Sequence, residues 1–373
     1  MKLDSTITNR QTKPRNTNLE LFRIISMILI VAHHYVVNSG MMAEMATHPF
    51  AGNSLFFYLF GAWGKTGINC FVMITGYFMC KSHITVKKFL KLLLQIMFYR
   101  IIIYFIFTIS GYESFSFLSF FELLIPVRNI SDGFTSAFIV FFLFIPFINV
   151  LLRNLTEKMH LRLIILCLFL YTFLGTVPGF RVTMNYVSWF ITIYFVTSFI
   201  RLYPKALFDK TKFWGIAALV SLVVSIASII VCLKLGKSAY GFIADSNKVL
   251  AVTTAFCAFV FFKNVRMPYI QVINIIASAS FGVLLIHANS DTMRQWLWRD
   301  MLQNAVVFNT PLCYLHFACS VLGIYFICTA IDLMRIYLLE KPFFRFYDKK
   351  SQQIYLKFYS VEDKILKKLH VNE

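Results

Sequence analysis

Apolar segments of membrane-crossing length dominate this sequence and restrict the folds open to it. A membrane-spanning α-helix needs about 20 consecutive, mostly apolar residues, and the chain has ten segments that approach or exceed this length. They cover approximately residues 19–37, 55–80, 89–109, 134–152, 161–177, 186–202, 213–233, 249–262, 271–288 and 312–338. Because strands of a membrane β-barrel are shorter and alternate apolar with polar residues, the pattern predicts an all-α polytopic membrane protein with about ten transmembrane helices.

The composition agrees with a membrane protein. Of the 373 residues, 58% are hydrophobic and 14% are charged, which excludes an ordinary soluble α/β enzyme. The net charge of +19 would suit a nucleic-acid-binding protein, but the basic residues lie in short loops between the apolar segments. We therefore expect no nucleic-acid partner and interpret the positive charge as a topology signal.

The distribution of Lys and Arg predicts which side of the membrane each loop faces. With the N-terminus inside, 26 of these residues fall in the segments facing the cytoplasm and seven in the outer loops. This bias predicts a multi-pass protein of the cell membrane with both termini cytoplasmic. The chain then divides into a cytoplasmic N-terminal segment (1–17), a transmembrane domain (18–338) and a basic cytoplasmic tail (339–373). Aromatic residues among the lysines of the tail indicate contact with anionic membrane lipids.

The first apolar segment carries the ionisable side chains Glu20, Arg23, His33 and His34. Ionisable groups inside the bilayer are costly and are usually functional. At about 100° per residue, the eleven steps from Arg23 to His34 return to within about 20° of the same helix face, and Glu20 lies within ion-pair reach of Arg23. His33 points about 100° away, toward a neighbouring helix or the edge of the site. We interpret the stripe of Glu20, Arg23 and His34 as one wall of a polar site inside the membrane.

Other predicted helices also place polar side chains within the membrane. Lys65 and Asn69 are one turn apart on the second segment, and Arg100 lies midway along the third. Ser280 and His287 are seven residues apart on the ninth segment and share a face to within about 20°. These five residues are candidates for substrate binding.

Structural alternatives exist for several of these positions. Lys65 could extend to the outer interface, Arg100 could pair with a carboxylate from another helix, and His287 could be an interfacial histidine. Asp332 and Arg335, three residues apart near the end of the tenth segment, are interpreted as a structural pair or an interface anchor.

Signals for metals and nucleotide cofactors are missing from the sequence. His33 and His34 are adjacent, so they do not form the i, i+4 pair that binds metal from one helix face. The eight cysteines include no CxxC pair, and the chain has no Walker loop and no GxGxxG motif. We therefore expect no metal site and no bound cofactor.

Five short motifs follow one another along the chain. They are Leu21-Phe22-Arg23 with Ser26, Val31 and His34; Gly67 to Tyr77; Ala137-Phe138 with Pro146 to Asn149; Ser188-Trp189-Phe190 with Tyr194; and Ser280 to His287. In this order, and on a ten-helix layout, they resemble the bacterial acyltransferase 3 family from about Asn18 to Lys349.

The resemblance implies a membrane enzyme that moves an acyl group, usually acetyl from cytoplasmic acetyl-CoA, onto a hydroxyl of a cell-surface or exported polysaccharide. Acetyl-CoA would be the acyl donor, a glycan the acceptor, and polysaccharide biosynthesis proteins possible partners. In such an enzyme His34 suits a general base or a transient acyl acceptor, and Arg23, supported by Glu20, suits donor binding or orientation of the histidine. Trp189 joins the substrate-binding candidates through its motif.

The chain departs from the family pattern in three places. Lys88, Lys91 and Gln95 stand roughly where arginines usually follow the second helix, and Thr75 replaces a common Ser. No extracytoplasmic SGNH-type domain follows the last helix, so the membrane domain is expected to complete the transfer itself or to pass the acyl group to a partner.

Two further functions also suit a polar cavity inside the membrane. One is a transporter or flippase for a lipid-linked glycan. The other is a non-catalytic partner of a polysaccharide synthase.

The charge bias predicts that topology reporters fused after Asn38 and after Glu373 report opposite sides of the membrane. Paired alkaline phosphatase and fluorescent-protein fusions measure this directly. Reporters on the same side would contradict the ten-helix arrangement.

Overall fold

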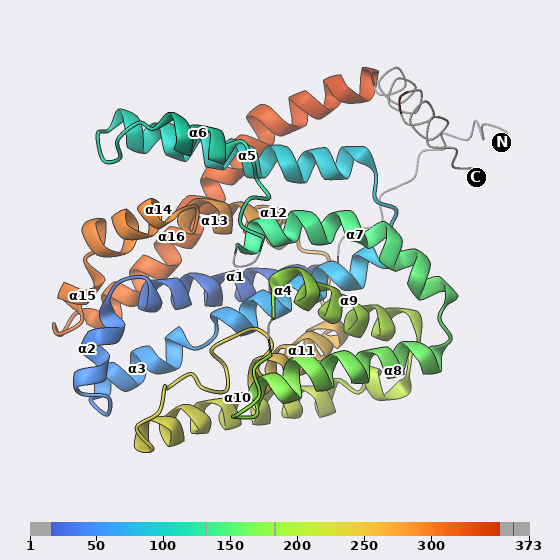
Figure 1. Cartoon of the computed structure of the whole chain (residues 1–373), viewed down its shortest axis with the longest axis horizontal. Coiled ribbons are helices and arrows are strands. Elements are labelled where there is room, and N and C mark those ends of the chain that lie inside the picture. The colour runs from blue at the N-terminus through green and yellow to red at the C-terminus, as the bar shows by residue number, and fades with distance from the viewer. Residues whose placement is uncertain (1–15, 131–132, 183, 351–360, 362–373) are drawn as a thin grey trace.

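The computed structural model describes residues 16–130, 133–182, 184–350 and 361, and the described chain forms a helical bundle without strands (Figure 1). The long helices are α1 (Thr17–Val37), α4 (Gly64–Met79), α5 (Val86–Ile109), α7 (Phe134–Asn154), α9 (Tyr186–Leu202), α10 (Thr211–Lys234), α11 (Val249–Asn264) and α16 (Cys313–Arg335). The shorter α-helices are α2 (Met41–Thr47), α3 (Gly52–Gly61), α6 (Phe117–Leu123), α8 (Glu157–Leu168), α12 (Gln271–Ser278), α13 (Ser280–His287), α14 (Asp291–Gln295) and α15 (Asn304–Val307). The π- or 3₁₀-helical turns are η1 (Phe169–Leu174), η2 (Ala206–Asp209), η3 (Trp296–Met301) and η4 (Ile336–Glu340).

Every apolar segment found in the sequence falls on one or two of these helices, which confirms the all-α membrane fold. The predicted segment 186–202 coincides with α9, whereas 55–80 is broken into α3 and α4 and 271–288 into α12 and α13. Five helices of the described chain are long and apolar enough to cross a membrane, or six if the bent pair Gln271–His287 and Asp291–Val307 is one span. The count of ten spans therefore stays a prediction, because broken and short helices make up the difference.

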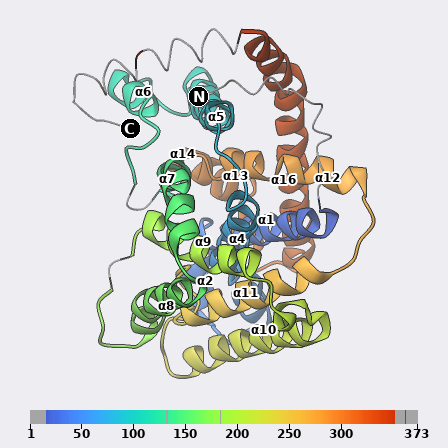
Figure 2. The ribbon, with the colours of Figure 1, turned by 90° about the vertical axis from the view of Figure 1, so that its right-hand side faces the viewer.

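Helix α1 lies inside the bundle rather than at its edge. Figures 1 and 2 show it with α4 between α13 and α16 on one side and α10 and α11 on the other. Its side chains Leu19, Met27, Val31 and Tyr35 are fully buried. A helix that carries four ionisable residues is thus enclosed by other helices, which is how polar groups are tolerated at membrane depth.

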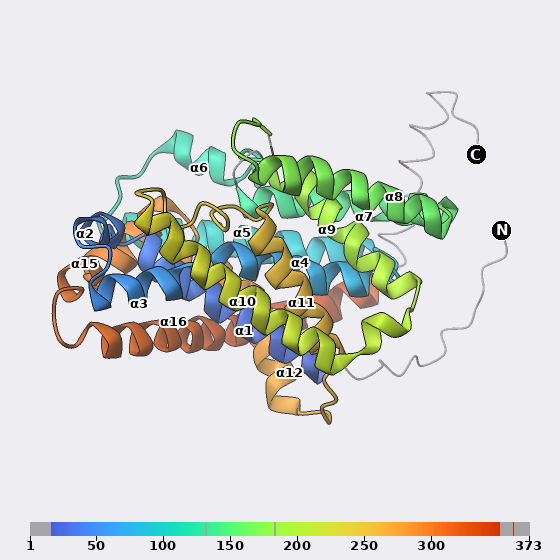
Figure 3. The same cartoon turned by 90° about the horizontal axis from the view of Figure 1, so that it is seen from below.

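Helix α10 has the opposite character and forms an outer surface of the bundle (Figure 3). Its residues Ile216, Leu219, Val220 and Val223 are exposed, and only 22% of its most apolar 18-residue stretch is buried inside the protein. Long exposed apolar faces on a soluble protein would aggregate. On this chain they are the surface that the acyl chains of the bilayer cover.

A network of charged and polar side chains joins α5 to the C-terminal part of α16. The Asp332 carboxylate, fully buried, accepts hydrogen bonds from Tyr99 Oη (2.8 Å), Gln95 Nε2 (3.3 Å) and Arg335 Nε (2.7 Å). Arg335 also pairs with Glu340 at 2.8 Å, and Lys91 pairs with the same carboxylate at 2.6 Å. The predicted Asp332–Arg335 pair is confirmed, and it is one part of a larger network that satisfies both charges.

Gly282 on α13 makes room for this network. A Cβ atom at position 282 would lie 2.1 Å from Cγ of Asp332, far inside van der Waals contact. We predict that Gly282→Ala lowers the free energy of unfolding by about 1–3 kcal/mol, the usual cost of overpacking a tight core. Thermal unfolding of the purified protein in detergent measures the change.

Gly323→Ala is the matched control, because position 323 lies on α16 with nothing within 4 Å of the added Cβ. Alanine has the higher helix propensity, so this variant should be as stable as the parent or up to about 1 kcal/mol more stable. Equal stability of the two variants would contradict the tight packing of Asp332 against α13.

Candidate functional site

The break between α3 and α4 sets the position of His33. The helix is interrupted at Ala62 and Trp63, and the Gly61 carbonyl at the end of α3 accepts a hydrogen bond from His33 Nδ1 at 2.5 Å. The His33 ring lies directly over Gly64, where a Cβ would come within 2.2 Å of the ring. The expectation that His33 faces a neighbouring helix is confirmed, and the glycines of the sequence GAWGKTG are what permit this contact.

His34 instead faces α13, where it meets His287. His34 Nδ1 lies 3.0 Å from His287 Nε2, and His287 Nδ1 lies 2.6 Å from the main-chain oxygen of Val283, one turn earlier on α13. The two residues are 253 positions apart in the sequence, so the contact joins two distant helices. His287 is fully buried among the helices, so it is not a histidine exposed on the surface of the protein.

When both imidazole rings are neutral, the hydrogen bonds determine which nitrogen of each ring carries the proton. A carbonyl oxygen only accepts, so His287 Nδ1 must carry the proton that it shares with Val283. His287 Nε2 then has a lone pair and accepts from His34 Nδ1–H. This leaves His34 Nε2 unprotonated, with a lone pair that can take a proton from another molecule.

A cavity of about 580 Å³ lies beside these histidines. Its wall includes both His33 and His34, and its other polar lining residues come from α4, α5, α7, α9, α14 and the adjoining loops. Among them are Lys65, Arg100, Asn129, Ser136, Tyr186 and Arg294. The size falls within the range of small-molecule sites. The charged lining consists of three cationic side chains and the Asp291 carboxylate, which pairs with Arg294 at 2.5 Å, so it is net positive and favours a ligand or transition state with negative charge.

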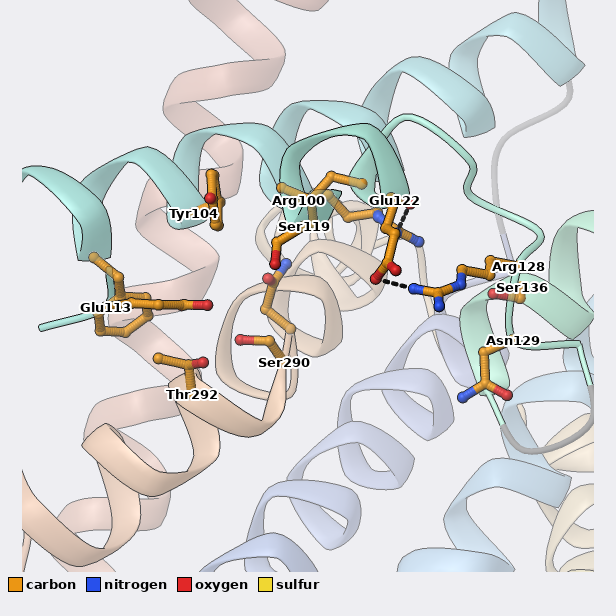
Figure 4. A pocket seen from close by; sticks show the side chains of 13 residues that line it. Arg100, Tyr104, Glu113, Ser119, Glu122, Arg128, Asn129, Ser136, Ser290 and Thr292 are labelled. Carbon is orange, nitrogen blue, oxygen red and sulfur yellow. Dashed lines mark hydrogen bonds and ion pairs between the residues drawn. The ribbon is translucent and has the colours of Figure 1, made fainter. Parts of the chain in front are cut away.

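A second cavity of about 250 Å³ continues from the first on the side of α6 (Figure 4). The two cavities share six lining residues, which are Arg100, Leu123, Asn129, Ser136, Asn289 and Ser290. The α6 segment folds back along α5, with Tyr104 Oη donating to the Ser116 carbonyl at 3.1 Å. The shared lining residues make these two spaces parts of one larger site.

Arg100, a substrate-binding candidate from the sequence, lines both cavities. Its Nη2 donates to the main-chain oxygen of Glu122 at 3.1 Å, while the Glu122 carboxylate forms an ion pair with Arg128 (Figure 4). The sequence alternative paired Arg100 with a carboxylate from another helix. Arg100 does contact Glu122 of another segment, but it binds the main-chain oxygen and not the carboxylate. The guanidinium keeps its charge beside the cavity.

Lys65 lies on the cavity wall at the start of α4. Its ammonium donates to Tyr186 Oη at 2.8 Å and lies 3.7 Å from the Asp245 carboxylate. Two partners hold the side chain in place, so it is a fixed part of the site.

Three other candidates are buried away from these cavities. Trp189 Nε1 donates to Asn69 Oδ1 at 2.8 Å, and Asn69 Nδ2 donates to the Ser246 carbonyl at 2.7 Å, with both side chains fully buried. Ser280 is also fully buried and lines neither cavity. The Asn69–Trp189 bond joins α4 to α9 and so supports the Lys65 region; direct substrate contact by these three residues stays a prediction.

Glu20 and Arg23 occupy the other end of α1. Arg23 Nη1 pairs with Glu20 Oε2 at 2.6 Å, which confirms the predicted ion pair. Eleven residues of helix separate Arg23 from His34, a rise of about 16 Å. Neither Glu20 nor Arg23 lines the cavity beside His34. The stripe seen in the sequence therefore reaches two separate regions of the molecule.

Sequence reasoning missed Tyr186, Arg294, Asn129 and Ser136 as lining residues. Arg294 lies outside the ten apolar segments, and the other three lie at helix starts or in loops, where helical periodicity gives no orientation. Among the described residues, no group of three or more His, Cys, Asp or Glu side chains is arranged to hold a metal ion.

Comparison with known proteins gives one result that bears on the chemistry. A family model for an acyltransferase domain, acyltransferase 3, matches residues 16–332. No curated protein and no solved structure matches the chain. The matched range extends from the start of α1 almost to the end of α16, so it includes every lining residue described above.

The His34–His287 bond predicts a specific effect of His287→Phe. Phenylalanine keeps a planar ring but cannot accept the hydrogen bond from His34 Nδ1, so the His34 tautomer and orientation are no longer fixed. We expect kcat to fall about tenfold, the equivalent of one lost hydrogen bond, with the KM of the acceptor unchanged because His287 does not line the cavity. Steady-state kinetics measure both constants, and a raised KM at constant kcat would contradict the positioning role.

Proposed function

We propose, because the chain belongs to the acyltransferase 3 family, that this membrane acyltransferase moves acetyl from cytoplasmic acetyl-CoA to a hydroxyl group of a cell-surface or exported polysaccharide. The family gives the reaction class. The donor, the acceptor and the roles of individual residues are our proposal. It rests on the chemistry that the cavity beside His34 can perform.

The single observation that carries the proposal is the free Nε2 atom of His34. It belongs to a side chain on the cavity wall and has no proton of its own, because Nδ1 carries the proton donated to His287. A neutral imidazole in hydrogen-bond reach of a hydroxyl is the commonest general base in enzymes. His34 is therefore the residue to which we assign deprotonation of the acceptor.

The acceptor oxygen attacks the acetyl carbonyl while its proton passes to His34 Nε2. The carbon–sulfur bond then breaks, the new ester remains on the acceptor, and the proton on His34 passes to the departing sulfur to give free CoA. Two cationic side chains at the cavity wall, Lys65 and Arg100, supply positive charge for the oxyanion that forms on the carbonyl, whereas Arg294 is already paired with Asp291.

The length of α1 gives a reason for the distance between Arg23 and His34. Phosphate groups bind well to guanidinium side chains, and we assign the donor's phosphates to the Arg23 end of the helix. The acetyl group is carried on a long flexible arm of CoA, which would run along α1 toward His34. The acceptor would then enter the cavity beside His34, at the other end.

The experiment that tests the function uses the full chain purified in detergent. Acetyl-CoA labelled in the acetyl group is added to total envelope polysaccharide from the source cells, and label in alkali-sensitive esters is measured. Transfer is the expected result. Absence of transfer together with movement of a lipid-linked glycan across vesicles would contradict the proposal and favour a transporter.

The two adjacent histidines give the sharpest internal comparison. His34→Gln removes the base while keeping a polar side chain in the cavity, and the rate of transfer should fall by about 10²–10⁴, the usual effect of losing a general base. His33→Gln should cost much less, since His33 mainly packs on Gly64 and bonds to Gly61. Rates are divided by the amount of membrane-inserted protein, and a wild-type rate for His34→Gln would contradict the catalytic assignment.

A further inference from the structure

We propose that a third cavity, on the far side of Lys65 and Tyr186 from His34, binds an uncharged sugar unit next to the one that is acetylated. This inference rests on the proposed function and names a part of the acceptor that it does not specify. The cavity has a volume of about 300 Å³, at the lower end of the range for small-molecule sites.

This third cavity adjoins the site described above. Lys65 and Tyr186 line both the cavity beside His34 and the third cavity. Their side chains are joined by the 2.8 Å hydrogen bond between Lys65 Nζ and Tyr186 Oη, so the pair forms a common wall. A ligand longer than one sugar unit could therefore lie across this pair, with one unit on each side.

The far wall of the third cavity is held in place by bonds between two segments. Asn247 Nδ2 donates to the Tyr171 carbonyl at 2.8 Å, and Lys248 Nζ donates to the Gly175 carbonyl at 2.5 Å. The amide of Val249 donates to Thr176 Oγ1 at 3.0 Å. These bonds fix the start of α11 against the end of η1, so a ligand would meet a wall that is already ordered and would spend little free energy on ordering it.

The lining side chains select for a ligand that is polar and uncharged. Lys65 and Lys248 donate, Asp245 accepts, and Tyr186 presents a ring. The Lys65 ammonium lies 3.7 Å from the Asp245 carboxylate and the Lys248 ammonium is bonded to the Gly175 carbonyl, so an ionic ligand would have to compete with these existing partners. An acyl chain would leave these polar groups without partners. A sugar unit has hydroxyls that both donate and accept, which matches the mixture.

A second sugar unit bound in the third cavity would contribute to catalysis as well as to affinity. Binding energy from parts of a substrate remote from the reaction can be used to hold the reacting group in place. The structure therefore predicts that acceptors of two or more sugar units are used better than a single unit.

The test uses size-fractionated oligosaccharides, from one to four units, released by mild acid from the envelope polysaccharide that the purified protein acetylates. For the wild type, kcat/KM should rise from the monosaccharide to the disaccharide or trisaccharide and then level off. In Lys248→Met and in Asp245→Asn, the ratio of kcat/KM for the tetrasaccharide to that for the monosaccharide should fall about tenfold, as expected when a hydrogen bond to a charged group is lost. Using both variants keeps the test valid if one of them fails to fold.

Lys237→Met is the matched control, since this lysine is exposed on the same connection between α10 and α11 and does not line the third cavity. Its ratio should equal that of the wild type. A wild type with no preference for length, or ratios unchanged in both variants, would overturn the sugar-binding assignment while leaving the proposed function intact. Absence of transfer to every fraction and to the intact polysaccharide would overturn the proposed function itself, and the subsite with it.

Discussion

The hydrogen bond between His34 and His287 is the interaction on which the rest of the site depends. It joins α1 to α13 across 253 positions of sequence, and it places one polar ring against another inside the helical bundle of a membrane protein. Buried polar groups at such depth are costly unless they are satisfied. The bond to Val283 satisfies His287, the bond to His287 satisfies one nitrogen of His34, and the remaining nitrogen of His34 is the one that we propose as the base.

Around this bond, the broken helices determine the shape of the site. The gap between α3 and α4 frees the Gly61 carbonyl for His33 and starts α4 at the cavity wall, where Lys65 can reach Tyr186. A continuous helix through residues 55–80 would use that carbonyl in its own ladder. Breaks of this kind are tolerated at membrane depth where the irregular backbone faces protein or a polar cavity, and both conditions hold here.

Much of the fold could be predicted from the sequence because apolar runs report directly on helices in a membrane. The Glu20–Arg23 and Asp332–Arg335 pairs were predictable too, because side chains three residues apart on a helix lie next to each other on its surface. Periodicity also placed Ser280 and His287 on one face of one segment, but it gives no information on which helix that face meets. The partnership of His34 with His287, the Asn69–Trp189 bond and the contribution of Tyr186 depend on packing between distant segments. The eleven-residue spacing of Arg23 and His34 predicted one polar site along α1, but Arg23 does not line the cavity beside His34, because about 16 Å of helix separates the two residues.

The measurement that tests this account most directly is the protonation of the two ring nitrogens of His34. Solid-state NMR on protein labelled with ¹⁵N-histidine in lipid bilayers separates protonated from unprotonated ring nitrogens, and the His34→Gln variant identifies the signals of His34 by difference. The account predicts a protonated Nδ1 coupled to His287 and an unprotonated Nε2 in the resting enzyme. A proton on Nε2 with a bare Nδ1 would contradict it, because the nitrogen facing the substrate would then be unable to act as the base.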